Sequence, residues 1–254
     1  MRGRNLAIIV AALRSGSGAT LLARVFADYF ILSRENPLIF DTDRLDRTLS
    51  RYFPHIATVI DLDRIQGQMT LFDTLASPLP EKRVVDVTRR SFRKFFNLMH
   101  DIDYLAEARL REIEPVIFYI VARDRESYEH GQALRDRFDC PFVVVDNAFL
   151  GEPSEEARRS SAYAALASHP LHMRMPPLDP LMADMITDEA LSLSAFMRQE
   201  QHNLSLAYLS LETRSSIRAW IMKVFKEIHR TTQALDGRPP AAEAAPAPRT
   251  AAQR

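Results

Sequence analysis

Short apolar segments and longer amphipathic segments alternate along the chain. The apolar segments are rich in Val, Ile and Phe, and most of them lack the period-two alternation of a half-exposed strand. Unbroken apolar runs of this length are typical of strands that are buried on both faces of a parallel sheet. The strands predicted in this way span residues 6–12, 37–40, 83–87, 116–121 and 142–145, with weaker candidates at 57–60 and 171–175.

The amphipathic segments repeat their apolar residues at helical spacing. In the first of them, residues 20–34, Leu22, Phe26 and Tyr29 fall on one face. Further helices are predicted over residues 91–99, 125–138, 154–168 and 210–230. Strands and helices that alternate with crossovers of this length predict an α/β fold, in three layers, with a mostly parallel sheet and helices on both of its faces.

The C-terminal part of the chain has a different pattern. Residues 181–235 contain no strand signal, so we expect an all-helical part that belongs to a single domain spanning residues 1–235. From residue 236 onward Ala and Pro dominate, and no aromatic or large aliphatic residue remains. Such a segment cannot bury enough apolar surface to offset the entropy lost on ordering. Residues 236–254 are therefore predicted to form a disordered tail.

Composition and charge narrow the classes of protein that fit. The 33 Lys and Arg residues balance the 33 Asp and Glu residues, which excludes attachment to nucleic acid or anionic lipid through bulk charge and leaves only a local patch. A single cysteine, Cys140, excludes an internal disulfide. The apolar run after Arg4 lacks a cleavage site, and no segment reaches the ~18 apolar residues of a membrane span. We therefore expect a cytoplasmic protein without a membrane span.

Two of the seven glycines lie in the segment that follows the first strand. Residues 12–21 read ALRSGSGATL, so Gly16 and Gly18 stand between a buried strand and a helix expected to begin at Thr20. In this arrangement backbone N–H groups can surround a phosphate that also faces the helix N-terminus. A hydroxyl at the first helical position can ligate Mg²⁺. The segment is thus a candidate phosphate-binding loop.

The loop resembles the deviant phosphate loop of the ParA/MinD family of P-loop ATPases, whose pattern is K-G-G-x-G-K followed by Thr or Ser. Laid on this pattern, the chain has Arg14 at the signature lysine, Ser15 and Gly16 at the glycine pair, Gly18 at the third glycine, Ala19 at the loop lysine and Thr20 at the magnesium hydroxyl.

Three further motifs resemble that family in the same order along the chain. Residues 41–43 (DTD) follow the second strand as the family's D-x-D does, Asp86 ends a buried strand, and Asn147 follows a late strand, where the family often has an asparagine near the purine. These runs, together with residues 144–151, are similar to the conjugal-transfer TraL-like branch. The resemblance covers roughly residues 5–230. It implies a P-loop NTPase-like fold that binds ATP or ADP with Mg²⁺.

The resemblance also implies roles for individual residues. Asp43 would position the attacking water, and Asp86 would hold Mg²⁺ through water together with Thr20. The residues expected to bind the nucleotide are Arg14, Ser15, Gly16, Ser17, Gly18, Ala19, Thr20, Leu21 and Asn147. Protein partners and a nucleotide-dependent homodimer are implied as well. Simpler roles stay open for some of these residues: Asp43 as a turn residue before a helix over 45–52, Asp86 as a cap at a strand end, and Arg14 as a solvated arginine.

Two departures from the family pattern weaken the case for ATP hydrolysis. Ala19 supplies no charge where the family's lysine holds the β- and γ-phosphates, and losing a donor of this kind costs roughly 10²–10³ in rate. Arg14 can offset part of this loss, because a guanidinium clamps phosphate oxygens through two hydrogen bonds. The segment after the third motif strand, residues 87–91, contains no glycine with which to reshape around a γ-phosphate. Hydrolysis is therefore predicted to be weak or absent.

The densest basic cluster, residues 89–94, lies within the sequence TRRSFRKFF. Because aromatic residues interleave with its cations, this cluster is the one candidate for contact with nucleic acid. The alternative is an amphipathic helix whose aromatic residues enter the core while its arginines face water.

Two classes of function follow from these observations. The first is a nucleotide-binding switch or scaffold with weak or absent hydrolysis, acting in plasmid maintenance or transfer or in intracellular positioning. The second is a nucleotide-independent interaction scaffold, a pseudo-NTPase that retains only the fold and binds a partner through the helices after Leu181 or through residues 89–94. Two further alternatives are a working ATPase in which Arg14 replaces both lysines, and an unrelated α/β fold with a coincidental Gly-Ser-Gly loop.

Overall fold

The computed structural model describes residues 5–188, 192–198 and 209–237. All but the first two residues of the predicted tail, residues 238–254, lie outside this part of the chain. Within it, one sheet of seven parallel strands has the order β3-β2-β4-β1-β5-β6-β7. The strands are β1 (Asn5–Ala12), β2 (Leu38–Asp41), β3 (Ala57–Val59), β4 (Arg83–Val87), β5 (Ile113–Val121), β6 (Phe142–Asn147) and β7 (His172–Met175). The five predicted strands and both weaker candidates are present.

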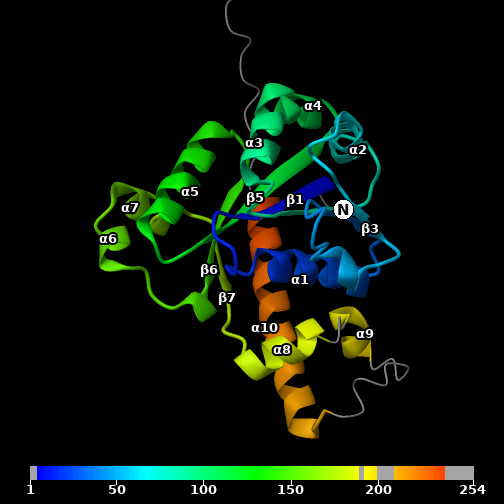
Figure 1. The fold of residues 1–254 in the computed structure, drawn as a ribbon, viewed down its shortest axis with the longest axis vertical. Helices are drawn as coiled ribbons and strands as arrows, with labels where there is room; N and C mark the ends of the chain where they lie inside the picture. Colours follow the sequence, from blue (N-terminus) through cyan, green and yellow to red (C-terminus); the bar gives the residue numbers. More distant parts are fainter. Residues whose placement is uncertain (1–4, 189–191, 199–208, 238–254) are drawn as a thin grey trace, which may run out of the picture.

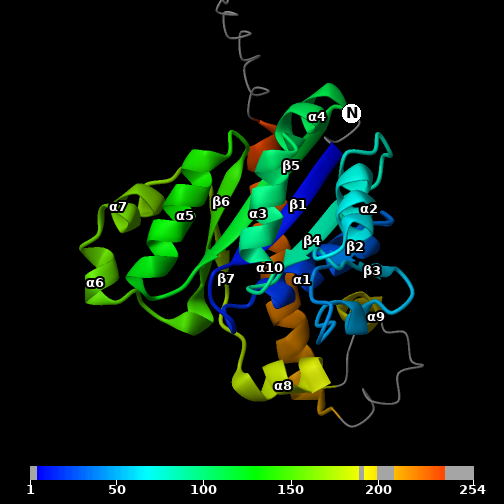
Figure 2. The ribbon, with the colours of Figure 1, turned by 45° about the horizontal axis from the view of Figure 1, so that its top comes forward.

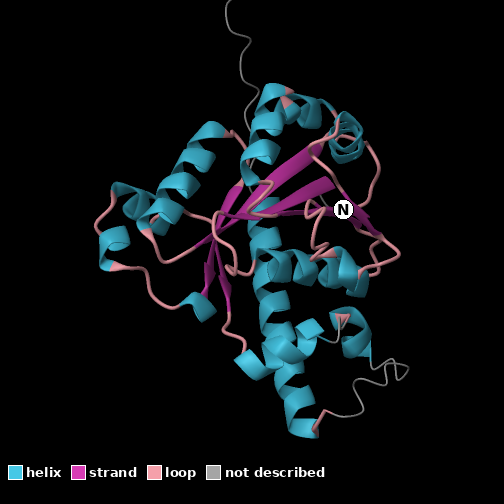
Figure 3. Ribbon diagram, viewed as in Figure 1, coloured by secondary structure: helices cyan, strands magenta, loops and turns pink. Residues whose placement is uncertain are grey.

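Helices cover both faces of the sheet (Figures 1 and 2). One face carries α1 (Ala19–Leu32), α8 (Pro180–Asp188), α9 (Leu193–Arg198) and α10 (Leu211–Asp236). The other carries α2 (Ile65–Leu75), α3 (Phe92–Asp101), α4 (Tyr104–Leu110), α5 (Arg125–Arg137), α6 (Glu155–Arg158) and α7 (Ser161–Ala167). A hydrophobic core lies on each face of the sheet, and the central strand β1 contributes to both. Its Ile8 and Val10 belong to one core and its Ile9 to the other. The predicted three-layer α/β fold is confirmed (Figure 3).

The structure differs from the predicted helices in three places. The prediction of a single helix over residues 154–168 is wrong, because α6 ends at Arg158 and α7 starts at Ser161. The Ser160 hydroxyl accepts a hydrogen bond from the N–H of Tyr163 (3.1 Å) and so caps a second helix. Helices α2 and α4 were not predicted. In place of a helix over residues 45–52 there is only the short 3-10 turn η1 (Ser50–Tyr52).

The carboxyl ends of β1, β2 and β4 meet at one edge of the sheet. Asp86 on β4 is in register with Val10 on β1 and with Asp41 on β2. The loop after β1, the turn after β2 and the turn after β4 therefore lie together. This edge is where open α/β sheets bind their ligands.

Candidate functional site

The loop between β1 and α1 has the backbone geometry of an anion-binding turn. Gly16 and Gly18 adopt positive φ angles of 74° and 94°. Gly18 is the N-cap residue of the 14-residue helix α1, whose N-terminus has neither a side-chain cap nor an acidic residue in its first turn. The buried Ser17 closes the turn by donating its hydroxyl to the carbonyl of Arg14 (2.7 Å), whereas Ser15 is exposed. The positive end of a helix that has no side-chain cap favours an anion.

Asn147, at the end of β6, holds this loop from the opposite side. Its Nδ2 donates to the carbonyl of Ser17 (2.9 Å), and its Oδ1 accepts from the N–H of Phe149 (3.2 Å). A Cβ atom added at Gly18 would lie 2.8 Å from Nδ2 of Asn147. The side chain that sequence reasoning assigned to nucleotide binding therefore shapes the backbone of the phosphate loop.

The two loop glycines give a matched pair of variants. Gly18→Ala is expected to lower the free energy of unfolding by about 2–3 kcal/mol, because it adds the cost of a left-handed alanine to the displacement of the buried Asn147 amide. Gly16→Ala carries only the first cost, about 1–2 kcal/mol, since no atom lies within 4 Å of its added Cβ. Urea unfolding of both variants measures the difference. Equal losses would show that Asn147 does not restrict the loop.

The half-buried Thr20 and the buried Asp86 form a hydrogen-bonded pair at the start of α1. The Thr20 hydroxyl donates to Oδ2 of Asp86 (2.7 Å), and Asp86 is fully buried. Burial raises the pKa of Asp86 to about 7; the Thr20 hydrogen bond opposes the rise, and the charges of Asp41 and Asp43 add to it. Its second oxygen, Oδ1, has no hydrogen-bond partner among the described residues. A buried carboxylate oxygen without a partner is costly, so it marks a place where a cation would be favourable.

The donors at this place suit Mg²⁺ that arrives with a phosphate ligand. Magnesium keeps several waters and is usually bound by one or two protein oxygens together with substrate phosphates. Thr20 and Asp86 supply two such oxygens next to the loop. The described residues contain no group of three or more His, Cys, Asp or Glu side chains that could hold a metal. The residues thus fit the magnesium of a bound nucleotide and not a metal held by protein ligands alone.

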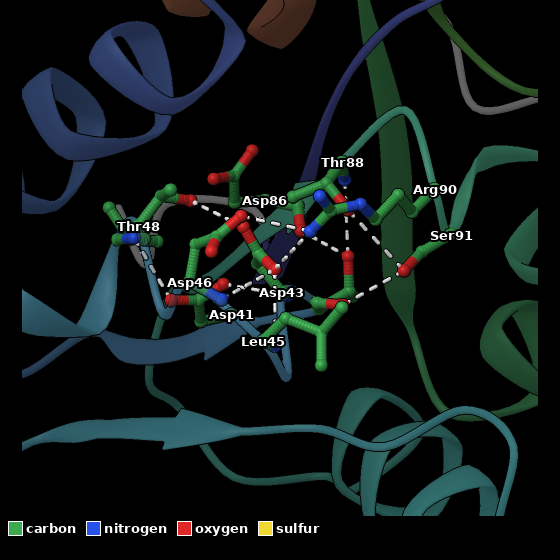
Figure 4. Close-up of polar contacts among 11 residues, drawn as sticks. Asp41, Asp43, Leu45, Asp46, Thr48, Asp86, Thr88, Arg90 and Ser91 are labelled. Carbon is green, nitrogen blue, oxygen red and sulfur yellow. Dashed lines mark hydrogen bonds and ion pairs between the residues drawn. The ribbon is translucent and has the colours of Figure 1, made fainter. Parts of the chain in front are cut away.

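Asp41 fixes the path of the chain after β2 (Figure 4). It is fully buried, and its Oδ1 accepts from the N–H of Asp43 (2.8 Å). Its Oδ2 accepts from the N–H groups of Leu49 (2.9 Å) and Ser50 (2.8 Å). One carboxylate therefore organises both ends of the turn over residues 42–50. The sequence placed Asp41 in the D-x-D motif but gave it no role, because its partners are backbone groups up to nine residues away.

Asp43 acts within this turn in the way that the simpler alternative describes. Its Oδ1 accepts from the N–H groups of Leu45 (3.3 Å) and Asp46 (3.1 Å), and its Oδ2 accepts from the Thr48 hydroxyl (3.4 Å). Arg90 reaches the same carboxylate at 3.7 Å and also pairs with Asp46 at 2.9 Å (Figure 4). The negative charge of Asp43 acts on Asp86 and helps to raise the pKa of Asp86. Its predicted role in orienting water remains a prediction.

Thr42 ties the turn after β4 to the turn after β2. Its hydroxyl donates to the carbonyl of Asp86 (2.8 Å) and accepts from the N–H of Thr88 (3.1 Å). The Ser91 hydroxyl in turn donates to the carbonyl of Thr42 (2.8 Å) (Figure 4). These bonds cross-link a segment without glycine, and they oppose the reshaping that a nucleotide-driven switch would require at this point.

Arg14 is paired with carboxylates of its own chain. Its Nε and Nη2 donate to the two carboxylate oxygens of Asp124 (3.2 and 2.9 Å), and Nη2 also contacts Glu126. The hydrogen bonds and charge of Asp124 raise the pKa of Arg14, and the hydrogen bond from Arg14 lowers the pKa of Asp124. Asp124 is also the N-cap residue of α5. The arginine at the family's signature position is therefore already engaged, by partners more than 100 residues away that no local pattern could reveal.

A pocket of about 250 Å³ adjoins the loop, and Thr20 and Leu21 form part of its wall. The remaining residues of the wall come from α1, from residues 48–52 and from the segment that includes α8. They are Arg24, Thr48, Arg51, Tyr52, Leu178, Ala183, Ile186 and Thr187. Leu21 is thus placed at the pocket, where it meets residues that sequence reasoning did not connect with the loop.

The basic cluster at residues 89–94 agrees with the amphipathic-helix alternative. Phe92 is buried in the core, as are the two aromatic residues that follow the cluster, and none of these rings can stack on a nucleic-acid base. Arg90 is paired as described, and Lys94 pairs with Asp63 (2.6 Å). None of the helices in the described part of the chain is long and apolar enough to cross a membrane.

Comparisons with known proteins concern the fold. No protein-family model matches the chain, and no curated protein sequence matches it. Among solved structures, a nucleotide-binding protein from Archaeoglobus fulgidus in complex with ADP is 12% identical, with 74% of this chain and 87% of that chain covered and a TM-score of 0.48.

Two further solved structures are similar over most of both chains. The MinC:MinD cell division protein complex of Aquifex aeolicus is 13% identical, with coverage of 88% and 96% and a TM-score of 0.49. The Cyanothece McdA–ATP complex is 12% identical, with coverage of 87% and 98% and a TM-score of 0.41. Similarities this remote assign no shared activity to the chain.

Proposed function

We propose that the chain is a ParA/MinD-type nucleotide-binding protein that binds ATP or ADP with Mg²⁺, hydrolyses it slowly or not at all, and acts as a switch or scaffold. One observation carries the proposal. The Thr20–Asp86 pair, with one buried carboxylate oxygen left unpartnered among the described residues, lies at the uncapped start of α1, directly after the Gly16–Gly18 turn. A phosphate group with its magnesium ion satisfies both features at once.

The groups at the site determine which part of a bound nucleotide each residue would contact. Backbone N–H groups of the loop and the N-terminus of α1 would hold the phosphates, and the Thr20 and Asp86 oxygens would hold Mg²⁺. When bound, the ion would neutralise phosphate charge. Asp43, beside Asp86, remains the candidate for orienting a water molecule. Asn147 and Asp41 support the site by fixing the backbone on either side.

Three observations support slow or absent hydrolysis. Ala19 offers no cation at the loop-lysine position. The guanidinium of Arg14 is engaged by Asp124 and Glu126. The turn after β4 is cross-linked through Thr42, so it is poorly suited to sense a γ-phosphate. Phosphoryl transfer depends on positive charge and on mobile switch segments. The loop does not provide the first, and the turn after β4 does not provide the second.

The biological setting and the partners rest on the resemblance alone. We place the protein in plasmid maintenance or transfer, in a TraL-like branch, or in the positioning of an intracellular cargo. Protein partners and a nucleotide-dependent homodimer belong to the same proposal. Nucleic acid could be contacted only through residues 89–94, whose Arg89 and Arg93 side chains are exposed.

A pseudo-NTPase that retains only the fold is the second candidate. This candidate is favoured because most of the groups that would bind a nucleotide already form hydrogen bonds or ion pairs with other residues of the chain. Asn147 bonds to the loop backbone, Arg14 is paired, and Asp43 caps its own turn. A scaffold of this kind would bind its partners in the same way with or without nucleotide.

Titration with a fluorescent ATP analogue in the presence of Mg²⁺ separates the two candidates. We expect saturable binding that Thr20→Val weakens about 10–100-fold, because the variant removes a magnesium oxygen and the donor to Asp86. Thr70→Val, at a half-buried position on α2, is the matched control and should bind as the wild type does. Absence of binding at millimolar nucleotide would leave only the scaffold candidate.

A further inference from the structure

An anionic ligand in the loop needs a cation that the loop itself does not provide. Ala19 is uncharged and Arg14 is held by two carboxylates. The next cation on α1, Arg24, is buried, donates to the carbonyl of Ile186 (3.0 Å) and stacks on the ring of Tyr52. A positively charged side chain that meets the phosphate beside Mg²⁺ must therefore come from another segment.

Residues 49–52 bring such a cation to the start of α1. The buried carboxylate of Asp41 accepts from the N–H groups of Leu49 and Ser50, which fixes the beginning of this segment. At its end, the Tyr52 ring lies 3.9 Å from the guanidinium carbon of Arg24 on α1. Arg51 is placed between these two anchors. Its position is therefore fixed by the fold, although the residue lies on a short 3-10 turn.

The side chain of Arg51 and the hydroxyl-bearing Thr20 line the same pocket of about 250 Å³. The ten residues of the pocket wall include no Asp or Glu, so no carboxylate of the wall neutralises its charge. The Thr48 hydroxyl in the same wall is already directed to Asp43. The exposed side chain of Arg51 makes no hydrogen bond or ion pair within residues 5–188, 192–198 and 209–237. In contrast to Arg14 and Arg24, it is available to a ligand.

We infer that Arg51 binds the terminal phosphate of a magnesium–nucleoside triphosphate held in the loop, and so supplies the charge that Ala19 lacks. The inference rests on the proposed function. A guanidinium presents paired N–H donors that match phosphate oxygens, and hydrogen bonds to charged groups contribute about 1.5–3 kcal/mol, which corresponds to roughly tenfold or more in affinity. A cation that reaches in from residue 51 contacts the end of the phosphate chain near Thr20, in the pocket that both residues line.

Arg51→Gln and Arg47→Gln are the variants that test this inference. Arg47 is exposed, lies four residues earlier in the same turn and does not line the pocket, so its variant controls for the loss of one positive charge from this surface. Binding of a non-hydrolysable ATP analogue and of ADP, both with Mg²⁺, is measured by isothermal titration. For Arg51→Gln we expect the triphosphate to bind about tenfold more weakly and ADP to change by less than about threefold. Arg51→Lys should restore part of the loss.

The outcomes separate this inference from the proposed function. Equal affinities in Arg51→Gln and Arg47→Gln would overturn it, and so would an equal loss of ATP analogue and ADP. If the wild type binds neither nucleotide, the proposed function itself fails. Thermal unfolding of Arg51→Gln should match the wild type, because the side chain is exposed and makes no hydrogen bond or ion pair in the described part of the chain.

Discussion

Replacing Asp86 with Asn is expected to stabilise the ligand-free protein above neutral pH and to weaken magnesium-dependent nucleotide binding. Asp86 is fully buried with a pKa of about 7, against a usual value of 3.8. Between these values the folded state keeps a proton that the unfolded state has released. Stability therefore falls as the pH rises from about 4 to 7 and is level above that range, at a total cost on the order of 4 kcal/mol. Asparagine avoids this cost and keeps an acceptor for Thr20.

Urea unfolding at pH 5 and pH 8 measures this effect. The variant should gain about 2–4 kcal/mol over the wild type at pH 8, and the gain should shrink toward pH 5. Asp73→Asn, at an exposed position on α2, is the control and should behave like the wild type at both values. A gain that is the same at both pH values would show that the buried carboxylate is not the titrating group. The same variant should bind Mg²⁺–nucleotide about 10–100-fold more weakly.

Removing the carboxylate of Asp28 should cost about 3–5 kcal/mol of unfolding free energy. Asp28 is fully buried in α1 and accepts from the N–H groups of Ser194 (2.9 Å) and Leu193 (3.3 Å) at the start of α9. It also faces the buried charge of Arg24, one turn earlier. Asp28→Ala leaves that charge without its counter-ion and leaves two buried N–H groups without an acceptor. We expect α9 to detach from α1.

Two measurements resolve the effect. Urea unfolding gives its size, and hydrogen exchange over residues 192–198 should show protection lost in that segment first. Asp73→Ala, an exposed helical position, should stay within about 0.5 kcal/mol of the wild type. Asp28→Asn should fall between the two, since it keeps an acceptor but loses the charge. A loss below about 1 kcal/mol in Asp28→Ala would contradict the buried-pair account.

The apolar runs sufficed to predict β1, β2, β4, β5 and β6 because these strands are almost entirely buried and need no alternation. The edge strands β3 and β7 are less buried and gave weaker signals. Helices α2 and α4 lacked a comparable signal. In α2 the buried residues are only Leu71, Phe72 and Leu75, while Ile65 and Met69 are exposed. In α4 only Tyr104 and Ala108 are buried. A helix that covers the core with two or three side chains leaves too short a periodic pattern to detect.

The candidate site divides in the same way into local and distant parts. Thr20 and Asp86 were predicted because their motifs resemble a family pattern in order along the chain. The structure brings them together because β1 and β4 are neighbouring strands. The partners of Arg14 depend on how α5 is placed, which no nearby residue encodes. The backbone role of Asp41 depends on the fold of a turn rather than on a motif.

Helix α1 joins the loop to the C-terminal helices through one rigid element. Thr20 stands in its first turn, Arg24 one turn later bonds to Ile186 of α8, and Asp28 in the next turn caps α9. A ligand that moves the start of α1 thus acts on both attachments. Any coupling of this kind is reciprocal. If a ligand at the loop changes the affinity of a partner protein for α8 and α9 by some factor, the partner changes the affinity of the loop for the ligand by the same factor. Binding of a ligand at the loop would then change the binding of a partner, and the reverse, without any hydrolysis.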